Sequence, residues 1–487
     1  MPLLPAGEYR PDVSDYQSST TRNILNVVPR GDGYGPFLGF AALSQTLPGP
    51  CRGGFVALRQ DGSVAIFGAT ATKLYLMDNT TFAWADVSKD ADDYADIPSA
   101  DQWGIKQFGN LVIAVQANAV PQVYDLTTST EFDDLGGSPP QARYIDIVGR
   151  FIVLTGLVSN PYRIQWSGLN GATTWTSGVN SSDYQDLPDG GVVRGVSGGE
   201  SGVIFQDQAI RRMTYLPGSP VIFQIEVIAR DKGLFAPLSL IRAGERTFFY
   251  SSQGFQVILP GQYPTPIGRE KVDRDVLTEL DKNNLRFFIG ASDPRNTRVF
   301  WAYKSVSGPV GGFDKMLCYD WVLDKFTPIS VQGEFLLPLT QPGLTLEGLD
   351  ALSGSLDALS GSLDDFATVV TPEIGAVSMD HQIGFFRGQS LEATIETAEQ
   401  GTDGQTIKVR GFRPVTDAPA LFGAASSRMT QQATPVAGPE VAINATTGRC
   451  DMIVSTRYSR MKCRIPAGTP WSFFAGVEPD VILKGKR

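Results

Sequence analysis

The sequence has few of the residues on which most enzymes and metal sites depend. Its 487 residues include a single histidine, His381, and four cysteines, Cys51, Cys318, Cys450 and Cys463. No two cysteines have the C-x-x-C spacing of a zinc knuckle. General acid–base chemistry near neutral pH usually needs a histidine or a tuned carboxylate pair, and no GxSxG nucleophile elbow accompanies His381. We therefore predict a protein that is not an enzyme, with no catalytic residue, no cofactor and no metal site.

Long apolar runs and charge are also scarce. No segment approaches the roughly 18 apolar residues of a membrane helix, and the N-terminus lacks the basic and apolar regions of a signal peptide. Charged residues make up 19% of the chain, and Asp+Glu (51) outnumber Lys+Arg (41), for a net charge of −10. Tight nucleic-acid binding needs clustered positive charge. The chain is therefore a poor candidate for it, although an acidic surface could line a channel through which DNA slides.

Two smaller patterns have a structural and a chemical interpretation each. Cys450 and Cys463 could face each other across a hairpin and pair, but we expect free thiols in a protein assembled in the cytoplasm. The spacing of an acidic run does not fit an EF-hand loop, so we expect a solvated loop between two units of structure there. The run comprises Asp86, Asp90, Asp92, Asp93, Asp96 and Asp101.

Glycine (52) and proline (32) are abundant, as in all-β proteins with many turns. From Cys51 onward, short β-runs alternate with turn signals such as Asp61-Gly62, Gly109-Asn110 and Gly149-Arg150. Units of strand, glycine turn, strand and strand recur about every 40 to 50 residues, the period of propeller blades. We predict an all-β protein with a β-propeller of about six blades. The units are 55–84, 102–126, 143–167, 192–228, 239–259 and 285–329.

The remaining segments predict the domain boundaries. Prolines break any regular element near the N-terminus, so residues 1–50 are predicted to be an irregular arm. The blades occupy 51–345. A seven-residue repeat, Leu-Asp-Ala-Leu-Ser-Gly-Ser, follows within 346–368, and its glycines argue against a coiled coil. We read it as a linker, with closing strands and a small C-terminal β-domain in 369–487.

A small basic cluster is the one candidate contact site. It comprises Arg457, Arg460, Lys462 and Arg464. The last three alternate along a predicted strand, so their side chains would share one face. That face is either a contact to a neighbouring subunit or to DNA phosphates, or simply a solvated strand.

Several segments resemble one known family. Tyr9-Arg10-Pro11-Asp12, Asn26-Val27-Val28-Pro29 and Gly33-Tyr34-Gly35-Pro36-Phe37 are similar to the opening of the tail nozzle proteins of short-tailed bacteriophages. These are also described as tail tubular or packaged-DNA stabilisation proteins. Trp166-Ser167 followed by Thr173-Thr174-Trp175, and the seven-residue repeat, also resemble segments of related phage proteins.

The resemblance implies a structural protein of the virion, assembled in the host cytoplasm. It implies a homohexameric ring below the portal and the adaptor, next to tail fibre or needle proteins. The ring would surround a central channel for double-stranded DNA, and would retain the packaged genome and then release it. The family has no catalytic residues to carry over to this chain.

Two other functions remain open for a propeller. One is a receptor-binding module that recognises glycans on the host surface, and a less favoured one is a propeller glycosidase. A ring-forming oligomer favours the nozzle, and glycan binding by an isolated monomer favours the receptor-binding module. Turnover of a host polysaccharide that depends on a pocket carboxylate favours the glycosidase.

Overall fold

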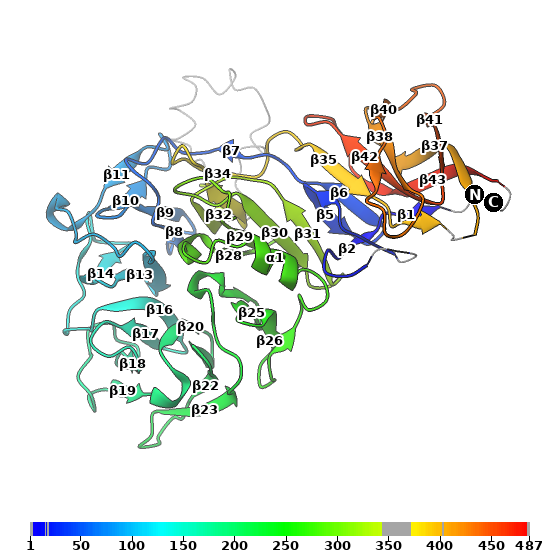
Figure 1. Cartoon of the computed structure of the whole chain (residues 1–487). Helices are drawn as coiled ribbons and strands as arrows, with labels where there is room; N and C mark the ends of the chain where they lie inside the picture. Colours follow the sequence, from blue (N-terminus) through cyan, green and yellow to red (C-terminus); the bar gives the residue numbers. More distant parts are fainter. Residues whose placement is uncertain (1–2, 15, 17–18, 343–371, 402–403, 485–487) are drawn as a thin grey trace.

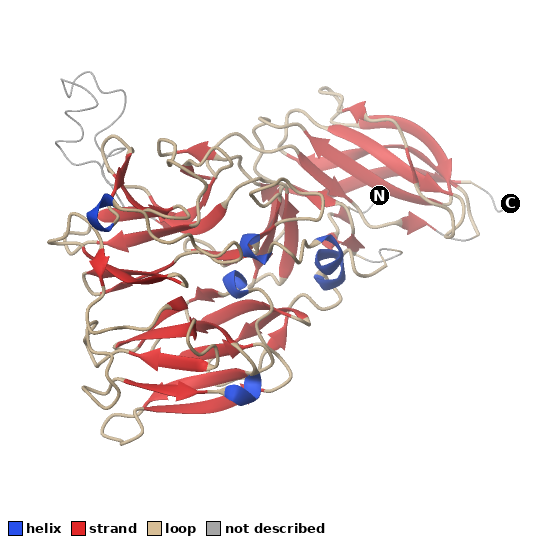
Figure 2. Ribbon diagram, turned by 60° about the vertical axis from the view of Figure 1, so that its left-hand side comes forward, coloured by secondary structure: helices blue, strands red, loops and turns tan. Residues whose placement is uncertain are grey.

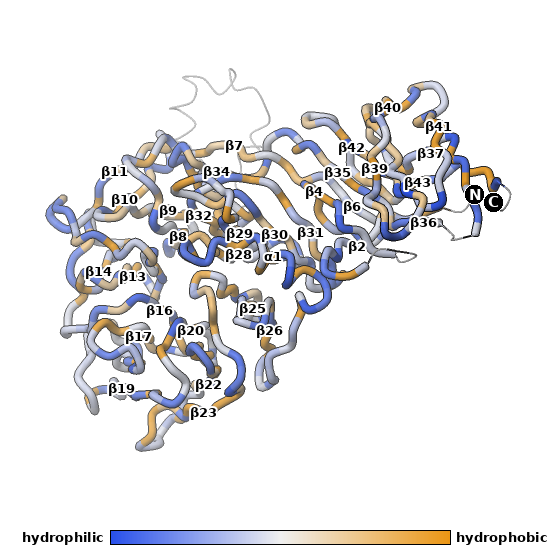
Figure 3. Tube along the Cα trace, viewed as in Figure 1, coloured by the Kyte–Doolittle hydropathy of each residue, from blue (hydrophilic) through white to orange (hydrophobic). Residues whose placement is uncertain are grey.

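The computed structural model describes the whole chain except residues 1–2, 15, 17–18, 343–371, 402–403 and 485–487. Seven four-stranded antiparallel sheets surround an axis, and a two-layered β-sandwich lies at one side of them (Figures 1 and 2). Hydrophobic and hydrophilic residues are interspersed in both parts (Figure 3), and central blade strands such as β9 and β17 are buried at every position, because both faces of a blade are packed. The all-β propeller prediction is confirmed, with seven blades in place of about six.

The first four blades follow the chain without interruption. Each blade runs from an inner strand at the axis to an outer strand at the rim. Blade 1 consists of β8 (Gly53–Leu58), β9 (Val64–Ala69), β10 (Leu74–Met77) and β11 (Trp84–Asp86), and blade 2 of β12 (Gly104–Phe108), β13 (Leu111–Gln116), β14 (Ala119–Asp125) and β15 (Asp133–Asp134). Blade 3 consists of β16 (Ala142–Val148), β17 (Phe151–Leu157), β18 (Arg163–Trp166) and β19 (Asp183–Asp186). Blade 4 consists of β20 (Val193–Ser197), β21 (Gly202–Gln206), β22 (Ile210–Tyr215) and β23 (Phe223–Ala229).

Short helical turns lie between several of the blades, and one α-helix lies between blades 5 and 6. The strands of blade 5 are β24 (Ile241–Ala243), β25 (Arg246–Ser251), β26 (Gly254–Ile258) and β27 (Thr265–Pro266), and those of blade 6 are β28 (Ile289–Asp293), β29 (Arg298–Tyr303), β30 (Lys315–Asp320) and β31 (Lys325–Ile329). The helical elements are η1 (Lys89–Ala91), η2 (Pro188–Gly190), η3 (Pro237–Ser239), α1 (Asp273–Glu279) and η4 (Leu285–Phe287).

Blade 7 closes the ring with strands from both ends of the propeller sequence. Its strands are β32 (Phe335–Thr340), β33 (Pro372–Val377), β34 (Ile383–Phe385) and β7 (Ala41–Ala42), in that order. The last strand comes from the N-terminal segment, which pairs Ala42 with Gly384. The predicted boundaries are therefore wrong here, because 1–50 is not a separate arm and the propeller continues past residue 345. The repeat at 346–368 lies outside the described residues, between two strands of this blade.

The sandwich consists of two sheets to which the N-terminal segment contributes four strands. One sheet has the order β41-β37-β43-β6-β5, with β1 beside β43, and the other has the order β39-β38-β42-β35-β4, with β36 beside β42 and β40 beside β38. The strands are β1 (Leu4–Pro5), β4 (Ile24–Leu25), β5 (Val27–Arg30), β6 (Gly33–Pro36), β35 (Ala393–Glu396), β36 (Gln400–Gly401), β37 (Ile407–Thr416), β38 (Phe422–Arg428), β39 (Val436–Ala437), β40 (Val441–Ala442), β41 (Cys450–Thr456), β42 (Tyr458–Ile465) and β43 (Phe474–Leu483); β2 (Glu8–Tyr9) and β3 (Thr20–Thr21) form a small parallel pair.

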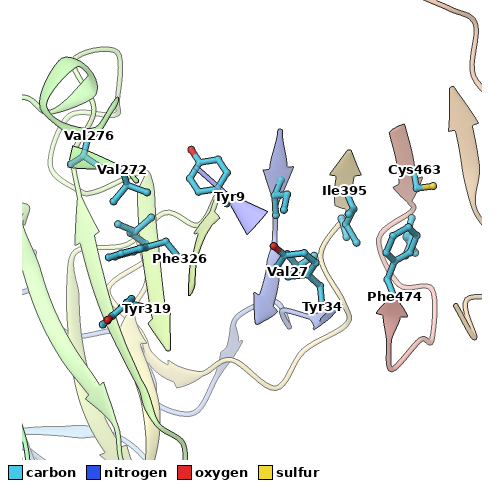
Figure 4. Close-up of a cluster of buried hydrophobic side chains, with 14 of the residues drawn as sticks. Tyr9, Val27, Tyr34, Val272, Val276, Tyr319, Phe326, Ile395, Cys463 and Phe474 are labelled. Atoms are coloured by element: carbon cyan, nitrogen blue, oxygen red, sulfur yellow. The ribbon is translucent and has the colours of Figure 1, made fainter. Parts of the chain in front are cut away.

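One hydrophobic cluster joins the two domains (Figure 4). It runs from Phe326 in blade 6, through Val27 and Tyr34 of the N-terminal segment, to Cys463 and Phe474 in the sandwich. Because buried apolar contacts of this kind supply most of the stability of a fold, the domains should behave as one body.

Asn26 fixes the junction between the two domains with hydrogen bonds in three directions. Its backbone N–H donates to the Pro328 carbonyl (3.0 Å), and its Oδ1 accepts the Ser330 N–H (2.8 Å). Its Nδ2 donates to the Glu392 carbonyl at 2.8 Å. The residue has φ of 59°, a left-handed conformation that asparagine tolerates better than most residues. The sandwich is thereby held against the outer strand of blade 6.

The N-terminal segment also caps α1. The Asp12 carboxylate accepts the N–H groups of Arg274 (2.9 Å) and Asp275 (3.0 Å), two donors at the start of the helix that lack partners within it. Asp273, in the first turn of α1, accepts the Phe255 N–H at 3.0 Å. Burial, with a smaller effect of the nearby Asp12 charge, raises the pKa of Asp273 to about 6. This carboxyl is therefore ionised at neutral pH in surroundings that disfavour its charge.

Replacing Asp273 by asparagine is expected to stabilise the protein at pH 7.5. The raised pKa means that the wild-type carboxyl contributes most below its ordinary pKa, and that this contribution is lost as the pH rises through about 6. We expect Asp273→Asn to gain about 1–2 kcal/mol at pH 7.5 and to lose the gain as the pH falls towards 4. Urea unfolding at a series of pH values measures this. Asp61→Asn, at an exposed turn, is the control and should give no gain in stability. Equal gains for Asp273→Asn at pH 4 and pH 7.5 would show that the charge of Asp273 is not the cause.

Candidate functional site

The inner strands of all seven blades surround an axial cavity of about 350 Å³. Apolar surface predominates in its wall. The lining includes Phe55, Ile105, Tyr144, Leu240 and Leu337, together with the charged residues Lys106, Arg143, Asp146 and Arg242. The volume of the cavity lies near the lower end of the range for small-molecule sites, about 300–1,000 Å³, and is far too small for a DNA duplex. Any passage for DNA would have to lie outside the propeller axis.

Polar side chains beside this cavity, among them Gln102 of its lining, connect segments from different blades. Arg286, on η4 before blade 6, donates to the Ser99 carbonyl at 3.1 Å, and Gln102 donates back to the Arg286 carbonyl at 3.3 Å. Arg52, before blade 1, donates to the carbonyls of Pro98 (2.8 Å) and Asp101 (2.5 Å). The loop before blade 2 is thus bonded to blades 1 and 6. Burial, together with the nearby Arg286 charge, lowers the pKa of Arg52 to about 10.

His381 lies where the propeller ring closes. Its Nδ1 is 2.9 Å from Oε1 of Glu334, a buried carboxylate just before β32. The other oxygen of Glu334 accepts the Cys51 N–H at 2.7 Å. Burial raises the pKa of Glu334, while the Cys51 N–H and His381 oppose that shift. The His381–Glu334 pair and the Cys51 N–H therefore connect blade 7 to the segment that enters blade 1.

The predicted basic cluster does form one face of a strand. Arg460, Lys462 and Arg464 alternate along β42, which lies inside its sheet between β38 and β35. Arg464 pairs with Glu440 at 2.6 Å and with Glu392 at 3.0 Å, and Arg460 lies 3.6 Å from Glu399. Arg457 precedes the strand. Because carboxylates accompany Arg460 and Arg464, contact of these two arginines with DNA would release few counterions.

The cysteines and the acidic run have structural surroundings. All four cysteines are buried and free, and burial raises the pKa of Cys51 and Cys318 to about 12, which keeps these thiols protonated and unreactive. The acidic run forms the connection between blades 1 and 2, where Asp86 pairs with Lys73 at 2.6 Å. Within the described ranges, no group of three or more His, Cys, Asp or Glu side chains is placed to hold a metal ion. No helix among those residues is long and apolar enough to span a membrane.

The structure also reveals a pocket that the sequence does not predict. It lies between blades 4 and 5, has a volume of about 320 Å³, and has Arg212, Arg242, Glu200 and Glu245 among its lining residues. These residues come from two blades and carry no local motif. Only the packing of one blade on the next brings them together.

Comparison with known proteins bears only on the fold. No family model and no curated protein matches the sequence. The extracellular domain of a hybrid two-component system from B. thetaiotaomicron is 9% identical, with a TM-score of 0.40 over 79% of this chain and 44% of that one. This chain therefore spans less than half of that protein's length.

Two further solved structures are similarly distant. Dihydro-heme d1 dehydrogenase NirN is 12% identical (TM-score 0.35; 86% of this chain and 79% of that one), and the computationally designed protein Ika8 is 10% identical (TM-score 0.34; 72% and 99%). Similarity at this level says nothing about function.

Proposed function

We propose that this protein is a structural subunit of a phage tail nozzle, which forms a ring around the path of the packaged DNA. The proposal includes six copies per ring, contact with the adaptor below the portal, and neighbouring tail fibre or needle proteins. It rests on the sequence resemblance of the N-terminal segment, and the structure adds three supporting observations.

The observation that carries the proposal is the union of propeller and sandwich into one body. The segment that resembles the nozzle family contributes β4, β5 and β6 to the sandwich and β7 to blade 7, and it caps α1. A subunit that must keep its shape under the pressure of a packaged genome needs such a rigid connection, because domains joined only by a linker move relative to each other.

The small axial cavity supports a channel between subunits. A propeller whose own axis encloses only about 350 Å³ offers no path for DNA. A ring of several copies would enclose a wider space, walled by the sides of the subunits. This is the geometry of a nozzle, and it leaves the propeller as a packed structural module.

The charge distribution also fits low-friction passage. Residues 386–487 contain 13 Lys+Arg and 9 Asp+Glu. Since the whole chain has 41 Lys+Arg and 51 Asp+Glu, residues 1–385 contain 28 basic and 42 acidic residues. The negative charge is thus concentrated in the part of the sequence that holds the propeller. A wall of that sign repels phosphates and lets DNA pass with little adhesion.

The test is the mass of the assembled species, measured by mass photometry and followed by cryo-EM of the source particle. We expect a closed ring of about six copies in the axial tail, as the proposal requires, with acidic propeller surfaces on its channel wall. Location at fibre tips as a monomer would overturn the proposal in favour of receptor binding. A ring with a basic channel would keep the nozzle and reject the low-friction explanation.

A further inference from the structure

A crevice lies between blades 4 and 5, beside the hydrophobic cluster that packs the two blades together. A buried hydrogen bond, 3.2 Å between the hydroxyls of Ser197 and Thr247, links the two blades there. The space beside this bond forms the pocket of about 320 Å³.

The floor of this pocket is apolar. Val203 and Ile228 of blade 4 and Ile258 and Leu259 of blade 5 line it, and the first three also belong to, or pack on, the hydrophobic cluster shared by the two blades. The volume lies at the lower end of the range for small-molecule sites, which are typically apolar with a few well-placed polar groups. A ligand's hydrocarbon part would therefore extend the existing core.

Charged groups of both signs surround the opening. Arg242 uses its Nε to donate to the Gly244 carbonyl at 3.0 Å, which leaves both terminal nitrogens for other partners. Glu200 and Glu245 are exposed at the same rim, and within the described part of the chain neither of them nor Arg242 forms an ion pair. Arg212 differs, because Glu226 neutralises it at 2.6 Å.

A glycine makes room for the free guanidinium. A Cβ atom at Gly199, in the turn between β20 and β21, would lie 2.8 Å from Nη2 of Arg242. The guanidinium of blade 5 therefore lies directly against the backbone of blade 4. Any side chain at this position would push Arg242 away from the rim.

We propose that the crevice between blades 4 and 5 binds a small zwitterion with an apolar body, of the class of the apolar α-amino acids. Arg242 binds its carboxylate through the planar two-nitrogen fork that suits this group. Glu200 and Glu245 bind its ammonium, and the side chain lies on the floor formed by Val203, Ile228 and Ile258. A dianion such as phosphate is disfavoured, because two carboxylates stand beside a single unpaired arginine. The site is independent of the proposed ring.

The experiment compares leucine with two molecules that each lack one charge. 3-Methylbutylamine is leucine without its carboxylate, 4-methylpentanoate is leucine without its ammonium, and glucose is a neutral polyol control. Binding is measured by saturation-transfer NMR and by the shift in melting temperature. We expect leucine to bind at least about tenfold more tightly than either half-molecule, because each loses a charge-assisted hydrogen bond.

Variants assign each charge. Arg242→Gln should lower the affinity for leucine to that for the amine and leave the amine unchanged. Glu200→Gln combined with Glu245→Gln should lower it to that for 4-methylpentanoate. All three positions are exposed at the rim, so an unchanged melting temperature without ligand shows that the variants fold. Equal binding of the three ligands, no binding at millimolar concentration, preference for glucose, or variants that bind leucine as the wild type does would each overturn the proposal.

Discussion

Deletion of residues 1–42 is expected to abolish the cooperative folding of both domains. The deletion removes β4 and β6, which pair Ile24 with Ile395 and Tyr34 with Phe474 inside the two sheets of the sandwich. It also removes β7, the strand that closes the propeller by pairing with β34. Val27 and Tyr34 would leave a core in which each is at most 1% exposed. Losing even one such side chain typically costs about 2–5 kcal/mol, against a total stability of about 5–15 kcal/mol.

Calorimetry and limited proteolysis measure this effect. The truncated chain should show no sharp melting transition and should be digested within both domains. Deletion of residues 1–3 is the control, since Leu3 is 44% exposed and the first strand begins at Leu4. That shorter deletion should melt within a few degrees of the full chain. A cooperative, protease-resistant truncation at residue 42 would show that the N-terminal segment only decorates a fold that is complete without it.

Local turn chemistry explains why most blades could be predicted from the sequence. The turns at Gly109 and Gly149 connect β12 to β13 and β16 to β17, and both glycines adopt positive φ, at 61° and 57°. Short hairpins of this kind need residues that accept such a conformation, and the sequence shows where they are. Because a blade is mostly three or four strands joined by such turns, its period survives in the sequence without any repeat of residue identity.

The C-terminal strands of the sandwich were expected from the sequence, but its N-terminal strands and the make-up of blade 7 could not be predicted in the same way. The four strands of blade 7 come from three separate stretches of chain, and β7 is only two residues long. The N-terminal strands of the sandwich are two to four residues long and are interrupted by prolines. These segments are too short, and their apolar and polar residues alternate too little, to be distinguished from loops in the sequence. They become regular strands only by pairing with distant strands. Pairing at such separation leaves no local signal.

The basic cluster illustrates the same limit for a candidate site. Its alternation on one strand face was predictable from the spacing of Arg460, Lys462 and Arg464. The acids that accompany it, Glu392, Glu399 and Glu440, come from other parts of the domain. A sequence shows the sign of each charge but not its partner, and the partner decides whether a cation is available to DNA.

The ion pair around Glu399 provides the second large expected effect. The Glu399 side chain is 1% exposed, and it accepts hydrogen bonds from Nε of Arg428 at 2.7 Å and from a second nitrogen of the same guanidinium. Removing one partner of a buried pair costs about 3–5 kcal/mol when the remaining charge has no other partner. Arg460 stays 3.6 Å from Glu399, so the cost should lie at the low end of this range, about 3 kcal/mol. We therefore expect Arg428→Ala to lower the free energy of unfolding by about that amount, measured by urea denaturation.

Two comparisons separate this charge effect from the loss of packing. Arg410→Ala removes an arginine of similar length from its pair with Asp480 (2.8 Å) on the exposed face of β37, and a surface pair of this kind contributes about 0–1 kcal/mol. The double variant Arg428→Ala with Glu399→Gln removes the stranded charge and should recover part of the loss, because a buried amide is far less costly than a buried carboxylate. Two results would contradict this interpretation. One is a loss of unfolding free energy for Arg428→Ala no larger than that for Arg410→Ala, and the other is no recovery of stability when Glu399→Gln is added. Either result would mean that the Arg428–Glu399 ion pair does not stabilise the sandwich. A large loss with recovery would instead establish that Arg428 of β38 holds Glu399 in a buried ion pair that stabilises the sandwich.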